Sequence, residues 1–362
     1  MAKRLKGKAL EEFKNAVKLR PFESRDAEPC NTLYNLVFKQ ERTVDQWRWL
    51  YEERPRGGHA TFVAELDGEI IGQYPTVFTL YKLGDREVLA ADHIDASMKR
   101  EYQGTGVYSK MGNMHHECFD LVFGMGFPTP IYYRFGSKTL GYIGVSKVPK
   151  WLKIFRSERI IERTVPVKPF VKLAGALCKP ATQILFRAKE KIPLEGFAFE
   201  KVEAFDGRVD ALWERVKEDR PFLLVRDSAF LNWRFRKNPF RRFDLFHLLR
   251  GGEVIGYVVC TVAAFKRGRK GFLADLLVIR DPEAEKAAIG FALEHFRSCG
   301  ADYVICLMLD KYYMDHLKRF GFVRIPTRTF LAFKNFNPGK INSEKLCIPD
   351  NWYISGADAD WV

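Results

Sequence analysis

The sequence lacks several features that would assign its class at once. It has no apolar run near the roughly 20 residues that a membrane-spanning helix needs. Its basic N-terminus, MAKRLKGKALEEFKNAVKLR, contains no apolar stretch of the signal-peptide type. The seven cysteines are scattered, odd in number and without a C-x-x-C pair, which argues against a disulfide framework and a structural zinc site. We therefore expect a cytoplasmic protein with reduced thiols.

Two common phosphate-binding signatures are also missing. The glycine segment EYQGTGVY (101–108) is not followed by the Lys-Ser/Thr of a P-loop, and it lacks the third glycine of a dinucleotide fingerprint. Gly104 and Gly106 nevertheless separate an apolar strand pattern from a helix pattern. Backbone N–H groups and a helix N-terminus at such a junction can cradle a phosphate or pyrophosphate. An ordinary glycine turn between strand and helix is the alternative.

Length, composition and charge limit the possible fold and partners less strictly. A chain of 362 residues exceeds what one hydrophobic core usually supports, so two domains are expected. A hydrophobic content of 47% supplies ample apolar surface for burial. The net charge of +14 attracts nucleic acid, acidic membrane surfaces and phosphate-bearing small molecules alike, so it does not choose among them.

An internal repeat supports two domains. The landmarks that recur 184 residues later are Trp49 and Trp233, Pro55 and Pro239, and Gly72 and Gly256. The segments DGEIIG (67–72) and GGEVIG (251–256) predict β-hairpin turns at matching places. Each copy reads helix, hairpin, strand, helix, strand, helix, glycine corner and terminal strand, which is a mixed α+β order.

The predicted boundaries place one domain at 1–156 and the other at 201–362. Between them, residues 157–200 mix basic and apolar residues and predict an amphipathic helical linker. Such a helix packs on a protein core or makes a peripheral contact with a membrane surface, and the sequence leaves both readings open.

The loop resembles motif A of the GCN5-related N-acetyltransferase (GNAT) superfamily, whose pyrophosphate loop reads Arg/Gln-x-x-Gly-x-Gly/Ala. Gln103, Gly106 and Tyr108 fall on the three defining positions, and Tyr108 departs from the usual small residue. We expect this large side chain to narrow the loop. Other segments resemble a tandem-domain branch whose members often accompany envelope or polysaccharide biosynthesis: DQWRW (45–49), FPT (127–129), FLNWRF (230–235) and residues 352–360.

The resemblance implies two tandem GNAT-like domains, each with a mixed, mostly antiparallel sheet flanked by helices. It also implies acetyl-CoA or another acyl-CoA as co-substrate, a primary amine as acceptor, and no metal. The residues that it places at the cofactor are Ser97 and Met98, acting by backbone on the thioester, and Gln103, Gly104, Thr105, Gly106, Val107 and Tyr108 in the loop.

Three ionisable residues precede the loop on the predicted strand 88–99. Strand alternation puts Asp92 on one face and His93 with Asp95 on the other. Family members often place a carboxylate base near the position of Asp92, which makes it the first candidate; His93, Asp95 or a relaying water are the alternatives.

A general acid for the leaving thiolate is commonly a Tyr in the helix after the next strand. Tyr132 is the candidate here, with Tyr133 beside it, and Ser137 takes this place if Gly141 is the family's corner glycine. His115 and His116 have no Cys or Asp partner at metal-ligand spacing in the sequence, so we interpret them as surface or packing residues.

The second copy differs where the first has its loop. Residues 279–287 read IRDPEAEKA, with three acids, a proline and no glycine, and acids beside phosphates would repel them. We therefore expect only the first copy to bind acyl-CoA. Two other functions stay open: an aminoacyl or peptidyl transferase that uses charged tRNA, against which the loop argues, and a catalytically silent acyl-CoA-binding module. The acceptor, whether amino sugar or another small amine, and the oligomeric state stay undetermined.

Overall fold

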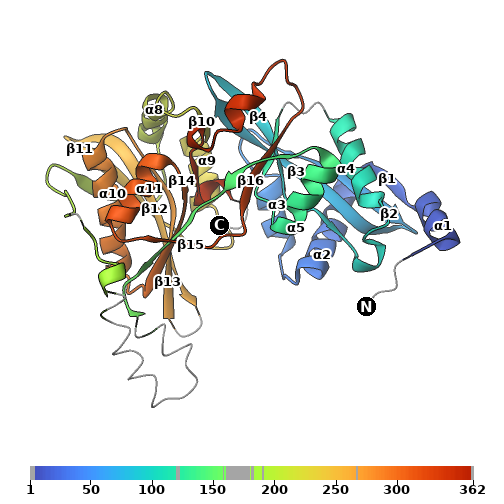
Figure 1. The fold of residues 1–362 in the computed structure, drawn as a ribbon, viewed down its shortest axis with the longest axis horizontal. Coiled ribbons are helices and arrows are strands. Elements are labelled where there is room, and N and C mark those ends of the chain that lie inside the picture. The colour runs from blue at the N-terminus through green and yellow to red at the C-terminus, as the bar shows by residue number, and fades with distance from the viewer. Residues whose placement is uncertain are drawn as a thin grey trace, which may run out of the picture. The chain divides into compact units, whose positions relative to one another are not determined.

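The computed structural model describes residues 5–119, 123–157, 159, 180, 183–189, 191–265 and 268–359. These residues form two compact units, each built on one mixed sheet (Figure 1). Unit 1 takes its described residues from 5–81, 86–146 and 329–347, and unit 2 takes them from 82–85, 147–328 and 348–359. Most of the predicted linker 157–200 lies outside the described residues.

The sheet of unit 1 has the strand order β1-β2-β3-β4-β6-β16-β7, with β5 paired to β3. Its strands are β1 (Lys18–Pro21), β2 (His59–Leu66), β3 (Glu69–Leu83), β4 (Arg86–His93), β5 (Ser97–Met98), β6 (Phe123–Gly126), β7 (Ile143–Lys147) and β16 (Phe330–Asn335). Its helices are α1 (Lys8–Ala16), η1 (Ser24–Asp26), α2 (Ala27–Phe38), α3 (Val44–Tyr51), η2 (Arg100–Tyr102), α4 (Val107–Cys118), α5 (Pro130–Phe135), η3 (Gly136–Leu140) and α12 (Ser343–Leu346).

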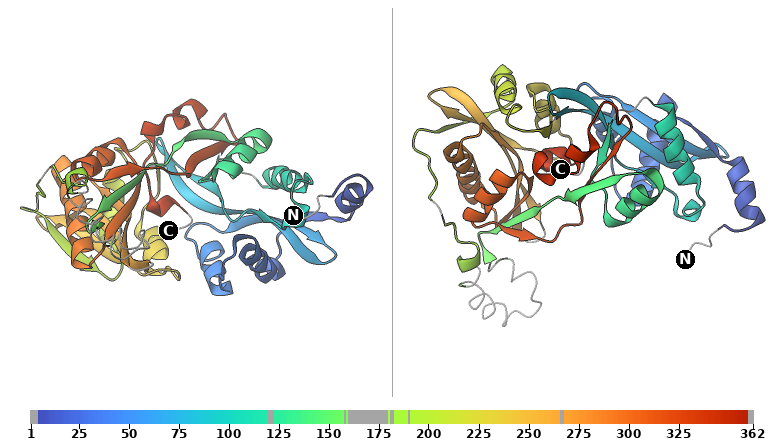
Figure 2. Two further views of the ribbon diagram at one scale, coloured as in Figure 1. Left: turned by 60° about the horizontal axis from the view of Figure 1, so that its bottom comes forward. Right: turned by 45° about the horizontal axis from the view of Figure 1, so that its top comes forward.

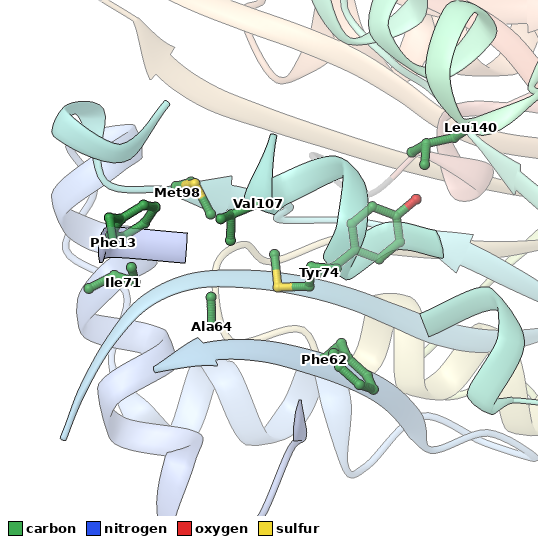
Figure 3. Packing of buried hydrophobic residues seen from close by; sticks show 9 residues of the cluster. Phe13, Phe62, Ala64, Ile71, Tyr74, Met98, Val107 and Leu140 are labelled. Carbon is green, nitrogen blue, oxygen red and sulfur yellow. The ribbon is translucent and has the colours of Figure 1, made fainter. Parts of the chain in front are cut away.

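Helices cover both faces of this sheet because its central strands are apolar on both sides. Phe62 and Ala64 of β2 belong to one buried cluster, which includes Val107 of α4 (Figure 3). Val63, between them, belongs to a second cluster with Leu33 of α2. Alternate side chains of a strand point to opposite faces, so α4 packs on one face and α2 on the other, as Figures 1 and 2 show.

Unit 2 has the strand order β15-β8-β14-β13-β12-β11-β9, with β17 paired to β14. Its strands are β8 (Lys150–Ile154), β9 (Ala198–Val202), β10 (Phe222–Leu224), β11 (Asp244–Arg250), β12 (Glu253–Phe265), β13 (Gly268–Val278), β14 (Tyr303–Leu309), β15 (Val323–Ile325) and β17 (Ile354–Ser355). Its helices are α8 (Gly207–Val216), α9 (Ser228–Leu231), η4 (Asn232–Arg236), α10 (Pro282–Ser298), α11 (Lys311–Arg319), η5 (Pro349–Asn351) and η6 (Gly356–Asp358).

The two predicted hairpins are confirmed, with the same turn. Asp67 and Gly68 join β2 to β3 with φ of 49° and 81°, and Gly251 and Gly252 join β11 to β12 with φ of 57° and 85°. Positive φ at both central residues is the type I′ turn, whose twist matches that of the flanking strands. Both hairpins also carry a bulge at the same repeat position, after Ala64 and after Leu248. The sequence repeat is therefore a structural repeat, and the expected α+β class is confirmed.

The strands at the ends of the two repeats do not follow the predicted domain boundaries at residues 156 and 201. In unit 1 the terminal strand β7 pairs not with β6 but with β16, which comes from the end of the chain. In unit 2 the terminal strand β15 pairs with β8, which comes from the first half. Each sheet is thus completed by a strand from the other repeat. A short alternating strand fits the open edge of either sheet equally well by its pattern, so the sequence did not reveal this exchange.

No helix in the described part of the chain combines the length and the apolar character needed to cross a bilayer.

Candidate active site

The glycine loop of unit 1 leaves a helix N-terminus open. Gly104 and Gly106 both adopt left-handed φ, 80° and 85°, and α4 begins directly afterwards without a side-chain cap. A Cβ placed on Gly106 would meet no atom within 4 Å, so a ligand can approach the backbone there. Gln103 donates from Nε2 to the Met98 carbonyl at 3.0 Å, and Thr105 donates from Oγ1 to the Tyr102 carbonyl at 2.8 Å. The loop is therefore held by its own side chains, and the Val107 N–H also donates to Thr105 Oγ1 at 3.5 Å.

Two cations that the sequence analysis missed flank this loop. Arg100 precedes it, Lys110 lies in the first turn of α4, and both are exposed. Within the described residues neither forms an ion pair, whereas the neighbouring Lys99 is paired with Glu69. Free cations beside an open helix N-terminus strengthen its attraction for phosphate. Basic residues within four positions of the loop glycines were the available signal.

The matching helix of unit 2 is closed to an anion. Asp281 caps α10, and its Oδ1 accepts from the backbone N–H groups of Glu283 at 2.9 Å and Ala284 at 3.2 Å. Pro282, at the first helical position, has no N–H to offer. The protein's own carboxylate thus occupies the place that a phosphate would take, which adds a structural reason to the expectation that unit 2 binds no acyl-CoA.

Tyr108 does not narrow the loop, and that expectation was wrong. Its partly buried ring packs between Tyr74 of β3 and Phe135 of α5, with centroid distances of 5.6 and 5.2 Å. It packs against the cluster drawn in Figure 3. As the second residue of α4, it directs its side chain back toward the sheet rather than toward the helix N-terminus. The position that a small residue usually fills is therefore part of the core here.

Asp92 lies where two parallel strands separate. The ladder between β4 and β6 pairs Ala90 with Phe123 and ends with Asp92 opposite Met125. The Asp92 side chain is buried, with 5% of the residue exposed. Asp92 therefore lies at the end of the parallel ladder between β4 and β6.

The expected continuous strand 88–99 is broken, which overturns the predicted placement of Asp95. β4 ends at His93, Asp95 has a left-handed φ of 50°, and β5 begins at Ser97. His93 lies on the α4 face, with its ring 5.2 Å from that of Tyr74. Asp95 does not share that face, because alternation does not continue through a left-handed residue.

Asp95 instead fixes the bend between β4 and β5. Its Oδ2 accepts from Arg42 Nη1 at 2.5 Å and from the Tyr51 hydroxyl at 2.8 Å. Gln73 donates from Nε2 to the Asp95 carbonyl at 3.3 Å and to Ser97 Oγ at 3.1 Å. Both sides of the bend are thus anchored. Asp95 has a structural ion pair, and Ser97 is held with its backbone paired to β3.

Among the three candidates for the general acid, Tyr132 reaches this bend. Its hydroxyl donates to the Ala96 carbonyl at 3.1 Å. Burial raises the pKa of the Tyr132 phenol, so it keeps its proton at neutral pH. Tyr133 stacks on Phe330 at 4.8 Å, and Ser137 of η3 donates to the Tyr133 carbonyl of the preceding helix α5.

His93 and His116, both partly buried, lie together with the fully buried His115. His115 packs against Tyr74 and Phe119, as the interpretation of it as a packing residue expects. One ring nitrogen from each lies within 4.8 Å of the others. Burial lowers the pKa of His93 well below its usual range, that of His115 to about 4 and that of His116 to about 3, so all three are neutral at pH 7. Sequence spacing did not indicate this set of histidines because His93 comes from β4, whereas His115 and His116 lie on α4.

Unit 2 has a carboxylate at the position of Asp92, but its surroundings are filled. Asp275 lies 183 residues after Asp92 in the sequence. The same number separates Phe123, which pairs with β4, from Cys306, which pairs with β13 in the parallel ladder of unit 2. Its carboxylate accepts from Arg226 Nε at 3.1 Å, the Tyr257 hydroxyl at 2.7 Å and the Ser355 hydroxyl at 2.7 Å. Ser355 belongs to β17, which pairs with the end of β14. The C-terminal segment therefore covers Asp275 in unit 2.

Comparisons with solved structures extend the likeness over both units. A probable N-acyltransferase of unknown function from Enterococcus faecalis V583 has a TM-score of 0.62 at 13% identity, covering 88% of this chain and 73% of its own. A GCN5-related N-acetyltransferase from Anabaena variabilis gives 0.61 at 12% identity, with 89% and 73% covered. Eis1 from Mycobacterium abscessus gives 0.57 at 14% identity, with 92% and 76% covered. At these identities the likeness concerns the fold.

The sequence comparison is more specific about unit 1. None of the curated proteins matches the chain in sequence. A family model described as an acetyltransferase (GNAT) domain matches residues 18–139, which run from β1 through the glycine loop and α5. Both the open loop and the separating strands lie inside this match. Residues 18–139 thus match the acetyltransferase (GNAT) domain, and the fold of the two units is similar to that of solved acetyltransferases.

Proposed function

We propose that unit 1 transfers an acetyl group from acetyl-CoA to the primary amine of a small molecule, such as an amino sugar. One observation carries the proposal: the N-terminus of α4 is open behind two left-handed glycines, whereas that of α10 is capped by Asp281. A helix N-terminus left uncapped at an exposed loop is a binding site for a phosphate group. Acetyl-CoA brings a pyrophosphate together with the acyl group that the GNAT family transfers.

Binding follows from the residues around the loop. The N–H groups from Gly104 to Tyr108 face the pyrophosphate, and Arg100 and Lys110 balance its charge. The thioester arm extends from the loop toward the bend between β4 and β5, where Ser97 and Met98 stand at the position that orients the thioester in the family. Holding the thioester still beside the incoming amine supplies much of the rate, because it replaces a bimolecular encounter.

The chemistry needs one proton acceptor and one proton donor. The amine nitrogen attacks the thioester carbon, and Asp92 accepts the proton that the amine loses, directly or through a water. The C–S bond then breaks, and Tyr132 donates its phenolic proton to the departing thiolate. Asp95 holds the bend through Arg42 and Tyr51, so we assign this role to Asp92, which stands at the position where GNAT members often place a carboxylate base. Asp92 is preferred over His93, because burial holds the pKa of that imidazole far below neutrality.

Two other functions predict different behaviour. A silent acyl-CoA-binding module would bind acetyl-CoA without releasing CoA thiol in the presence of any amine. A transferase that uses charged tRNA would act without acetyl-CoA, and the uncapped loop, which such an enzyme does not need, counts against it. The basic net charge is shared by all three and decides nothing.

The experiment measures thiol release from acetyl-CoA with a panel of amino sugars, polyamines and amino acids. An Asp92→Asn variant should bind acetyl-CoA with unchanged affinity while kcat falls by roughly 10²- to 10⁴-fold, the usual contribution of a general base. The defect should shrink at high pH, where the amine loses its proton without help. Full activity of Asp92→Asn at neutral pH would remove Asp92 from the mechanism. Acetyl-CoA binding without turnover on any amine would favour the silent module.

A further inference from the structure

Three of the seven histidines surround one point inside unit 1. The ring centroids of His93, His115 and His116 are 5.7, 5.5 and 5.7 Å apart, with interplanar angles between 62° and 80°. Imidazoles that bind one tetrahedral Zn²⁺ at about 2.0–2.1 Å have ring centres separated by about 5 Å. The three rings are therefore already close to the arrangement that surrounds a single ion.

The hydrogen bonds of two of these rings suit metal binding. His115 uses Nε2 to donate to the Ala60 carbonyl at 3.1 Å, and His93 uses Nδ1 to donate to the Ala91 carbonyl at 3.1 Å. A carbonyl can only accept, so each ring must carry its proton on that nitrogen, and its other nitrogen has a lone pair. A backbone carbonyl on the far nitrogen is the usual support of a metal-ligating histidine.

The unpartnered lone pair of His115 is an independent observation that points to a ligand. His115 is completely buried, and its Nδ1 has no hydrogen-bond partner among the described residues. A buried acceptor without a donor costs about 1–3 kcal/mol, so such an atom calls for an explanation. A cation bound by the three rings would satisfy it.

His116 shows that the group accepts a cation. Its Nδ1 lies 3.1 Å from the ammonium nitrogen of Lys334 on β16, and its Nε2 lies 3.4 Å from the Tyr74 hydroxyl. The long side chain of Lys334 is only partly buried and can turn outward. A metal ion would then take over the lone pair that the ammonium holds. Tyr142 stands beside the group, with its hydroxyl 3.0 Å from both ring nitrogens of His93.

We propose that His93, His115 and His116 bind one divalent transition-metal ion, Zn²⁺ in the first instance, with Tyr142 or a water at the fourth position. Three imidazoles favour Zn²⁺, Co²⁺, Ni²⁺ and Cu²⁺ over Mg²⁺ or Ca²⁺, which prefer oxygen ligands. The ion ties α4, the helix that begins at the glycine loop, to β4, the strand that carries Asp92. The inference stands independently of acetyl transfer, because it is tested without substrate.

The chain offers a matched control in unit 2. Asp244, His295 and Cys299 also bring three ligand atoms within 4.8 Å of one another. There, however, Asp244 is already paired with Lys201 at 2.7 Å and with His295 at 3.0 Å, so its charge is balanced by the protein. A His295→Gln variant therefore changes a comparable group that we do not expect to hold the ion.

The test uses the full chain, freed of metal with a chelator and titrated with Zn²⁺ and with Co²⁺. We expect one ion per chain, a rise in Tm with Zn²⁺ but not with Mg²⁺, and the visible absorption of four-coordinate Co²⁺. His116→Gln should lower the Zn²⁺ affinity by about 10²-fold or more, since even the loss of a supporting residue costs 10- to 100-fold. His295→Gln should leave it unchanged. Lys334→Met, which removes a competing cation, should raise it.

Two results would overturn the proposal. One is a wild-type chain that shows neither the Co²⁺ absorption nor a Zn²⁺-dependent rise in Tm. The other is an ion that His295→Gln releases and His116→Gln retains. The spectrum of the wild-type chain and the gain in Lys334→Met do not depend on whether His116→Gln folds, so a destabilised variant leaves the test intact.

Discussion

Gly106→Glu separates the cost of a strained backbone from the cost of lost phosphate binding. Gly106 has φ of 85° and open space where a Cβ would stand, and Gly252 in the β11–β12 turn of unit 2 has the same φ and the same open space. A non-glycine residue in this left-handed region costs roughly 1–2 kcal/mol. Both Gly106→Glu and Gly252→Glu should therefore lower Tm by a similar amount, about 2–8 °C.

Acetyl-CoA binding should respond to only one of the two variants. A carboxylate about 5 Å from a phosphate charge is repelled by about 1–3 kcal/mol at the effective dielectric constants of a protein surface. Two pyrophosphate charges then raise Kd by at least about 30-fold in Gly106→Glu. Titration calorimetry at low salt measures this, and added salt should restore part of the affinity. Unchanged binding by Gly106→Glu, or an equal loss in Gly252→Glu, would refute the assignment of the phosphate site to the start of α4.

Four further substitutions test separate parts of the account. Tyr108→Ala should lower the free energy of unfolding in urea by about 3–5 kcal/mol, because its ring is a core contact; a simple gain in CoA affinity would contradict this. Tyr132→Phe should slow thiol release while the Kd for acetyl-CoA stays unchanged. Arg226→Met should destabilise the chain by about 3–5 kcal/mol, because it leaves buried carboxylates without their cationic partner, and it should leave acetyl-CoA binding intact. Burial lowers the pKa of His59 from 6.5 to about 4, so the neutral ring stabilises the fold above pH 6.5 and this contribution is lost as the pH falls toward 4. In His59→Phe, the free energy of unfolding should therefore decrease less between pH 6.5 and pH 4 than in the wild-type chain.

The repeat and its hairpins could be predicted because they depend on local chemistry. The pairs Asp67-Gly68 and Gly251-Gly252 are residues that tolerate positive φ, and their spacing to the flanking strands is visible in the sequence. The start of α4 after Gly106 was predictable for the same reason. The exchange of β8 and β16 was not, since it depends on which sheet edge a strand meets and not on its own pattern.

The site was predicted less well than the fold, because its chemistry depends on long-range contacts. Asp95 looked like a neighbour of His93 until a left-handed φ turned it toward Arg42. Tyr108 looked like part of the loop, although its position in the first turn of α4 directs its ring into the core. Contacts between residues far apart in the chain, such as that between His93 and His116, leave no spacing signal for a sequence reading to detect.

Titration of the wild-type chain with acetyl-CoA tests the central claim most directly, because the two units differ in one respect that calorimetry can count. The N-terminus of α4 is open, while that of α10 is capped by Asp281 and the space beside Asp275 is filled by Ser355. The account predicts one acetyl-CoA site per chain. Two equal sites, or no binding at all, would contradict it.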